Sequence, residues 1–198
     1  MLEKMALRVH AEKVVTLKAC RDMFMAILMF VGFLRESEAV GLLAEDVWVE
    51  DEMPDGSKGR VLYMVIKHSK TDKYGENATV VVSEARHSRI CPVAWYEKYS
   101  RMRRESLFLF HKIPKGSLEK LGTTTPCAIV KNLLGMIGVD PKGYGSHSMR
   151  RGAATAASEA HVKMHVIKRH GRWKSDAVYM YIDDSIAQQL SVSQAILG

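Results

Sequence analysis

The chain has 198 residues, of which 47% are hydrophobic and 26% are charged, and its 29 Lys and Arg against 22 Asp and Glu give a net charge of +7. This length suits one domain with a core of its own, and the apolar fraction excludes a wholly disordered chain. The longest uncharged apolar run, residues 23–34, is shorter than the roughly 20 residues that a membrane span needs.

The N-terminal residues and the cysteines favour a reducing, intracellular location. The opening MLEKMALRVHAEK carries charges throughout, so it lacks the apolar core of a secretion signal. Cys20, Cys91 and Cys127 are widely spaced and in no CxxC pair, so we expect free thiols packed in the interior. The basic balance favours nucleic acid as a partner, although only slightly on charge alone.

The first half of the chain predicts two helices followed by strands. Residues 12–31 have a helical pattern that leads into the apolar run, and residues 35–43 form a second, short helical stretch. Residues 47–49, 60–67 and 79–83 are rich in β-branched and aromatic side chains. The last two of these runs flank the polar loop HSKTDKYGENA, which predicts a β-hairpin with a long, basic tip.

The second half of the chain predicts mainly helices. Pro92 suits the first turn of a helix, and Ser146 is a suitable cap for a later one. The expected helices cover residues 92–104, 127–137, 146–160, 161–170, 175–182 and 184–197, with a short extended piece at 107–110. We therefore expect a mostly helical α+β fold with a small antiparallel β-sheet, built as a single domain over residues 1–198.

Three basic clusters lie far apart in the sequence. Arg35 directly follows the apolar run, a second cluster sits on the hairpin tip, and His147 and Arg150 are i, i+3, so they share a helix face. Each cluster alone has an ordinary explanation, such as a pair between Arg35 and Glu38 or a solvated tip. The basic residues of the tip are Lys67, His68, Lys70 and Lys73.

Four segments in this order resemble the catalytic domain of the tyrosine recombinase (phage integrase) family. FVGFLRESEAVGL resembles the stretch around the family's first arginine, SKTDK its lysine-bearing hairpin loop, and SHSMRRGAATAA its His-x-x-Arg helix. GRWKSDAVYMYI resembles the segment that carries the nucleophile, in the form seen in Crypton and DIRS-type mobile elements of eukaryotes. The resemblance extends from about Lys18 to the C-terminal helix. The residues that it assigns to catalysis are Arg35, Lys70, His147, Arg150, Trp173 and Tyr181.

The resemblance implies a site-specific enzyme that cleaves and rejoins double-stranded DNA through a 3′-phosphotyrosine, without a metal, a cofactor or ATP. Guanidinium groups are planar, charged and bidentate, so Arg35 and Arg150 are expected to hold the non-bridging oxygens of the phosphate, as an oxyanion hole does. Histidine titrates near neutral pH, and His147 is the expected general base for the tyrosine. The covalent intermediate conserves the energy of the phosphodiester for rejoining.

The remaining roles also follow from the resemblance. Lys70 is expected to protonate the leaving 5′-oxygen. Trp173 takes a position that is more often histidine, and its indole N–H can donate to a phosphate oxygen but cannot transfer protons as histidine does. Glu38 is expected to orient the site through Arg35 or His147. The residues expected to contact the DNA backbone are Lys67, Lys73, Arg151 and Arg172.

The identity of the nucleophile has an alternative. On an α-helix Tyr179 and Tyr181 are i, i+2 and point about 160° apart, so that only one of them faces the arginines. The distance from Trp173 favours Tyr181, although this interval is one residue shorter than the common pattern of the family. Tyr179 is then expected to pack. The alternatives to Lys70 are Lys67 and Lys73.

Other functions stay open at this point. The chain could be a domesticated, non-catalytic module that binds DNA or a protein, or it could relax supercoils as type IB topoisomerases do. His161 and His165 are i, i+4 with His170 nearby, which is a spacing found in zinc sites. No carboxylate or cysteine in that stretch completes a ligand set, so we expect no metal site.

The two ends of the chain carry expectations about assembly. Residues 1–17 are expected to be a linker from an N-terminal core-binding domain. Residues 184–198 resemble the family's exchanged C-terminal helix, which implies a homo-tetramer on DNA, whereas packing within the same chain is the alternative. We expect no membrane partner, and a location in the nucleus of a eukaryote or the nucleoid of a prokaryote.

Overall fold

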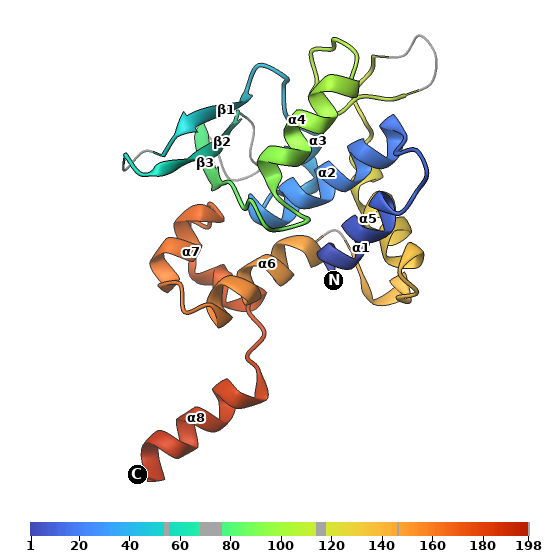
Figure 1. The fold of residues 1–198 in the computed structure, drawn as a ribbon. Coiled ribbons are helices and arrows are strands. Elements are labelled where there is room, and N and C mark those ends of the chain that lie inside the picture. The colour runs from blue at the N-terminus through green and yellow to red at the C-terminus, as the bar shows by residue number, and fades with distance from the viewer. Residues whose placement is uncertain (54–55, 68–76, 114–117, 146, 198) are drawn as a thin grey trace.

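The structure, a computed structural model, describes residues 1–53, 56–67, 77–113, 118–145 and 147–197. The fold is mostly helical with one small sheet, as expected from the sequence (Figure 1). The N-terminal half contains α1 (Leu2–His10), α2 (Leu17–Val31), α3 (Glu36–Gly41), β1 (Val47–Glu52), β2 (Lys58–Ile66) and β3 (Ala78–Ser83). The C-terminal half contains α4 (Pro92–Met102), α5 (Thr125–Met136), η1 (Pro141–Gly143), α6 (Ser148–Glu159), α7 (Met164–His170), η2 (Asp176–Tyr181) and α8 (Ile186–Leu197).

Helix α2 is the centre of the core. Every residue from Cys20 to Met29 is buried, and α1, α4, α5 and α6 pack around it (Figure 1). The helix begins at Leu17, later than the sequence pattern indicated, because the Thr16 hydroxyl accepts a hydrogen bond from the Ala19 amide at 3.2 Å and caps it. The C-terminal end of this helix leads into the candidate site.

The segment expected to be a linker, residues 1–17, contains helix α1 instead. Leu2, Met5, Ala6 and Val9 are all buried in the main core. Their spacing of i, i+3, i+4 and i+7 places them on one face of the helix. Charged residues lie between them in the sequence and occupy the solvent-facing side of the helix, so the apolar face does not appear as a continuous run.

The sheet has the order β1-β2-β3 and is antiparallel throughout. Val47 pairs with Met64, and Leu62 pairs with Val82, which confirms the expected hairpin between the second and third strands. The predicted residues at its tip, from His68 to Lys73, lie outside the described residues, and so does the predicted cap Ser146.

The C-terminal elements form a second, smaller cluster. Phe33, Ala153, Ile167, Trp173 and Val178 pack together there, where α6, α7 and η2 meet the end of α2. The stretch expected to be a helix over 175–182 is a 3-10 helix, η2. Helix α8 extends away from this body (Figure 1), and none of its residues is buried.

The three cysteines are free thiols, with Cys20 and Cys91 buried and Cys127 half-buried. None of the helices within the described ranges has the length and apolar character needed to cross a membrane.

Candidate active site

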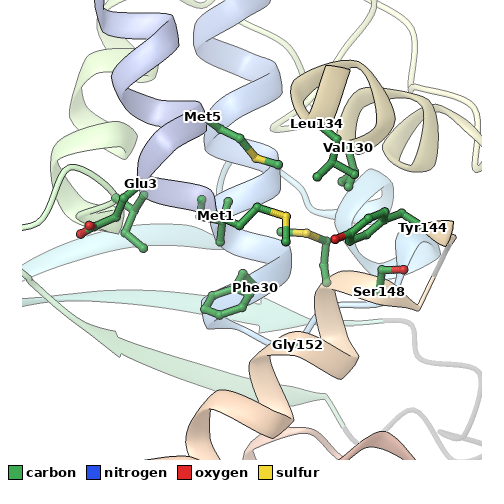
Figure 2. Close-up of a pocket in the computed structure, with 12 residues that line it drawn as sticks. Met1, Glu3, Met5, Phe30, Val130, Leu134, Tyr144, Ser148 and Gly152 are labelled. Carbon is green, nitrogen blue, oxygen red and sulfur yellow. The ribbon is translucent and has the colours of Figure 1, made fainter. Parts of the chain in front are cut away.

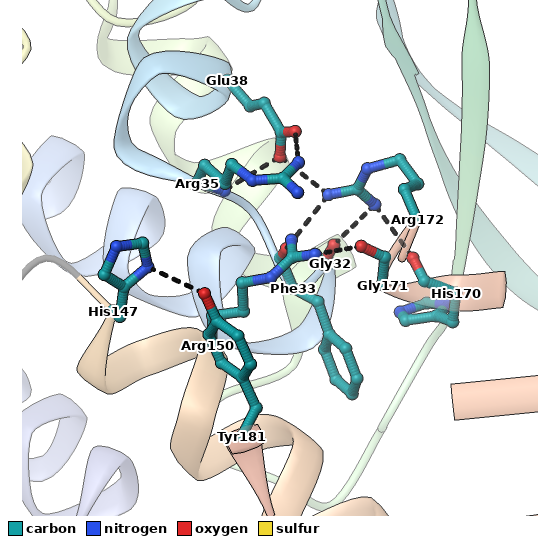
Figure 3. Close-up of polar contacts among 10 residues, drawn as sticks. All are labelled: Gly32, Phe33, Arg35, Glu38, His147, Arg150, His170, Gly171, Arg172 and Tyr181. Carbon is teal, nitrogen blue, oxygen red and sulfur yellow. Dashed lines mark hydrogen bonds and ion pairs between the residues drawn. The ribbon is translucent and has the colours of Figure 1, made fainter. Parts of the chain in front are cut away.

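The site begins at the turn that follows α2. Gly32 is required there, because a Cβ would lie 2.9 Å from the Leu28 carbonyl oxygen and 2.9 Å from Met64 Cε. Phe33 has a positive φ of 49°, a conformation that few non-glycine residues adopt. The turn places Arg35 at the N-terminal cap of α3, and it aims the Phe33 carbonyl oxygen into the site (Figure 3).

Glu38 is the central carboxylate of the site, and its side chain is fully buried. Its Oε1 accepts a hydrogen bond from Arg35 Nη1 at 2.7 Å, and its Oε2 accepts from the Arg35 amide at 2.9 Å and from Arg172 Nη2 at 2.8 Å. Burial alone would raise the pKa of Glu38, but the Arg172 charge and the contacts of Arg35 bring it below its ordinary value. The carboxylate therefore pairs with Arg35 and Arg172, where the sequence had offered Arg35 or His147.

Arg172 is buried, which differs from the DNA contact expected of it. It lies in a turn with φ of 59°, and only 10% of its side chain is exposed. Nη1 donates to the carbonyl oxygens of Gly32 at 3.2 Å and His170 at 2.9 Å, and Nη2 donates to that of Phe33 at 3.0 Å in addition to Glu38. The sequence signalled its charge but not its partners, so this role was missed.

Arg150, from helix α6, forms the floor of the site and is 1% exposed. Its Nη1 donates to the Phe33 carbonyl and its Nη2 to the Gly171 carbonyl. The guanidinium carbon lies 4.0 Å from the centre of the Trp173 ring, a cation–π arrangement. Burial and the nearby charges of Arg35 and Arg172 lower the pKa of Arg150 to about 9, so this guanidinium is charged at neutral pH.

The Trp173 ring packs face-on against the Arg150 guanidinium. Its ring lies 5.2 Å from that of Tyr181 and 6.0 Å from that of Phe33, measured between centroids, and the residue is 8% exposed. The resemblance implied that its indole N–H donates to a phosphate. In the structure, the face of the indole ring contacts the Arg150 guanidinium.

Tyr181 and His147 face each other across the site. The Tyr181 hydroxyl lies 3.4 Å from His147 Nδ1 (Figure 3), and the two rings are arranged edge to face with centroids 5.9 Å apart. Tyr181 ends η2, while His147 caps α6. Tyr179 is 60% exposed, so the expectation that it packs in the interior is wrong. A 3-10 helix has three residues per turn, and this directs the two tyrosines to different sides.

Lys67 and Arg151, which were also predicted to contact DNA, form ion pairs with acidic side chains of the chain. Lys67 Nζ forms ion pairs with Asp46 at 2.7 Å and Glu45 at 3.2 Å. Arg151 is half-exposed and holds Asp183 in two hydrogen bonds of 2.8 Å and 2.6 Å. Lys70 and Lys73 lie outside the described residues.

Within the described ranges, no group of three or more His, Cys, Asp or Glu side chains is arranged to hold a metal ion. His170 Nε2 lies 2.8 Å from the Val31 carbonyl oxygen, so it joins the end of α7 to the end of α2. The arrangement offers a hydroxyl, an imidazole and a set of guanidinium groups. Such a set is able to bind an oxyanion and to attack it.

Comparisons with known proteins show which fold the chain shares and which sequences it resembles. No protein-family model matches the chain. An integrase/recombinase XerD homologue of Selenomonas ruminantium is 28% identical over 172 residues, which are 84% of this chain and 48% of that protein. The chain thus spans about half the length of this curated relative.

Solved structures share the fold over almost the whole chain. A post-cleavage complex of the XerH site-specific recombinase bound to a palindromic difH substrate has a TM-score of 0.73 at 15% identity, and the match covers 100% of this chain and 51% of that one. The Tn1549 transposon integrase in complex with circular intermediate DNA has a TM-score of 0.58 at 14% identity, with 97% and 62% covered. The chain therefore has the fold of a tyrosine recombinase catalytic domain, and its sequence match to an integrase/recombinase supports the same family.

Proposed function

We propose that this chain is the catalytic part of a site-specific DNA recombinase that cleaves and rejoins strands through a phosphotyrosine at Tyr181. The observation that carries the proposal is the 3.4 Å approach of the Tyr181 hydroxyl to His147 Nδ1, beside the guanidinium groups of Arg35 and Arg150. In such an arrangement the imidazole can accept the proton of the phenol, and the two cations can stabilise the phosphate that the phenol oxygen attacks.

The reaction follows from these positions. The Tyr181 oxygen attacks phosphorus while its proton passes to His147, and the bond from phosphorus to the 5′-oxygen breaks. A 3′-phosphotyrosine and a 5′-hydroxyl result, and Lys70 is proposed as the acid that protonates the leaving oxygen. Rejoining is the reverse step, in which the 5′-hydroxyl attacks the phosphotyrosine. Arg35 and Arg150 neutralise the charge that builds up on the non-bridging oxygens.

Tyr181 reaches the proposed catalytic groups of its own chain, so we propose cleavage in cis. Tyr181 contacts His147 of its own chain, and its ring centre is 5.9 Å from the guanidinium carbon of Arg150. A mixture of the Tyr181→Phe and Arg150→Ala variants should therefore form no more adduct than either variant alone. Restoration of the adduct in the mixture would contradict cleavage in cis.

Helix α8 supports a proposal of oligomerisation. It carries no charged residue, and Ile186, Leu190 and Leu197, which lie on one face, are 76%, 52% and 86% exposed. An uncharged helix with an exposed apolar face is suited to burial against a partner. We propose that it docks on a second copy of the chain, as part of a homo-tetramer on DNA.

An apolar pocket of about 260 Å³ is the proposed acceptor for that helix. It lies between α1, α5 and the start of α6, and it is lined by side chains that include Met5, Phe30, Val130 and Leu134 (Figure 2). Removal of residues 186–198 should leave the fold intact, since none of the described ones is buried, and should yield a monomer on DNA in analytical ultracentrifugation. A tetramer without α8 would contradict this docking.

Two broader expectations remain proposals. The segment GRWKSDAVYMYI favours an origin in a Crypton or DIRS-type mobile element, and the similarity to a transposon integrase supports a mobile element in general. A DNA substrate together with free thiols favours a location with the chromosomes inside the cell.

The test of the proposed function is a nicked suicide substrate that traps the covalent intermediate. The chain should form a protein–DNA adduct that Tyr181→Phe abolishes, while Tyr179→Phe, at an exposed position, retains it. An adduct that persists in Tyr181→Phe would refute the nucleophile. DNA binding without any adduct would favour the non-catalytic module, and relaxation of a plasmid that lacks target sites would favour the topoisomerase.

A further inference from the structure

Arg172 is a buried cation of the site to which the proposed reaction assigns no role. A guanidinium has five N–H donors. Four of those of Arg172 are used, by Glu38 and by the carbonyl oxygens of Gly32, Phe33 and His170. The fifth, on Nε, is buried. Arg172 therefore has no donor directed to a phosphate on the surface.

Arg172 instead connects the two arginines that are proposed to hold the phosphate. On one side it shares the carboxylate of Glu38 with Arg35, since each guanidinium donates to one of its two oxygens. On the other side it shares the carbonyl oxygen of Phe33 with Arg150 (Figure 3). A change at Arg172 thus reaches both guanidiniums through a single intervening group.

The backbone conformation and the burial of Arg172 both cost free energy. Its backbone has φ of 59°, a strained region for a residue with a side chain. Its burial and the charge of Arg35 act to lower its pKa, against the opposing effect of Glu38. Sites of function are where such strain and buried charge tend to be kept.

We propose that Arg172 is a positioning residue, which fixes Arg35 through Glu38 and fixes Arg150 through the Phe33 carbonyl. This inference rests on the proposed recombinase function. A planar fork of donors is needed for the task, and the single ammonium of lysine does not supply it. Arg172→Lys and Arg172→Met should both disturb the alignment of Arg35 and Arg150 and slow cleavage. If only the charge of Arg172 mattered, Arg172→Lys would cleave at the rate of the unmodified chain.

The test measures single-turnover cleavage of the suicide substrate at saturating DNA by the full chain. For both variants we expect a rate about 100-fold below that of the unmodified chain, as for the loss of one preorganised oxyanion donor, with DNA affinity within about twofold because Arg172 makes no surface contact. Arg101→Met is the matched control. Arg101 is 76% exposed and pairs with Glu97 at 3.5 Å, and its replacement should leave the rate unchanged.

A second substrate separates positioning from a merely structural role. With a methylphosphonate at the cleavage position, one non-bridging oxygen and its charge are absent, so the alignment of Arg35 and Arg150 matters less. The defect of Arg172→Met should then shrink to below about tenfold. An equal defect on both substrates would overturn the inference, as would wild-type cleavage by either variant. If Arg172→Met does not fold, Arg172→Lys carries the same comparison.

The outcome also distinguishes this inference from the function on which it rests. If the unmodified chain forms no adduct, the proposed function fails. If the unmodified chain forms the adduct and the Arg172 variants do so at the same rate, only the positioning role fails.

Discussion

Replacement of Glu38 by glutamine tests whether one buried carboxylate holds the arginine cluster together. The change is nearly isosteric, so packing is kept while the charge is lost. Glu38 accepts hydrogen bonds from both Arg35 and Arg172, but an amide has one oxygen and one NH₂ group. One of the two guanidiniums would therefore face a donor in place of an acceptor.

The magnitude follows from the burial of the three groups. The side chain of Glu38 is fully buried, while those of Arg35 and Arg172 are 17% and 10% exposed. Removal of one partner of a buried ion pair destabilises a protein by about 3–5 kcal/mol. Because Arg35 is partly exposed and can turn toward water, we expect the lower end, about 3 kcal/mol.

Urea denaturation at pH 7, followed by circular dichroism, measures this loss. With an ordinary slope of about 1–3 kcal/mol per molar urea, the midpoint should fall by at least about 1 M. Glu119→Gln is the control, because Glu119 pairs with Lys112 at 2.6 Å on the surface, where it is 71% exposed, and such pairs contribute little. A Glu38→Gln midpoint equal to that of the unmodified chain would refute the reasoning.

The same experiment at low pH checks the sign of the effect. The pKa of Glu38 is lower in the folded state than its ordinary value, so its contribution is fully present above the unfolded pKa of about 4.3 and is lost as the pH falls through the folded pKa. The difference between the unmodified chain and Glu38→Gln should therefore shrink below about pH 4.3. A difference that is the same at pH 3 and pH 7 would contradict the assignment of the charge.

Two further predictions concern the neighbourhood of the site and the core. A Cβ at Gly171 would lie 1.7 Å from the Trp173 ring, so Gly171→Ala should displace that ring, change its fluorescence and cost about 1–3 kcal/mol in urea denaturation. Gly143→Ala, with open space around it, is the control, and an unchanged spectrum in Gly171→Ala would count against the packing. Burial raises the pKa of Cys20 to about 11, so in the native protein a thiol reagent should modify Cys127 first, as followed by mass spectrometry. Early labelling of Cys20 would show that the core is open there.

The fold was predictable where apolar residues repeat with the period of one element. Helix α2 was located by its nearly continuous apolar run, because it is buried around its whole circumference from Cys20 to Met29. The strands β2 and β3 were located by their β-branched residues on either side of a polar loop. The linker expected over residues 1–17 followed from the position of this segment before the region that resembles the family, whereas the helical spacing of its four apolar residues indicates α1. The 3-10 form of η2 has no such local signal, because it depends on how the chain closes over α6.

The site was predictable only through the resemblance to a family. Arg35, His147 and Tyr181 are far apart in the sequence, and no local pattern brings them together. The structure places them in one site, with Tyr181 beside His147. The burial of Arg172 was missed, because it depends on a turn of positive φ and on a choice of partner by Glu38.

The charge balance of the cluster links its folding to its proposed function. Two guanidiniums pair with the carboxylate of Glu38 and a third, that of Arg150, donates to the Phe33 carbonyl beside them, so within the described part of the cluster the arginines exceed Glu38 by 3 − 1 = 2 charges. Such an excess opposes folding, and the carbonyl oxygens that accept hydrogen bonds from Arg150 and Arg172 act against this effect. A phosphodiester supplies one negative charge and develops a second as the attacking oxygen bonds to phosphorus. Arg35 is the most exposed of the three arginines, so it is the one that a backbone phosphate would reach first. A charge excess that opposes folding of the free chain is therefore one that would favour the transition state of the proposed strand cleavage.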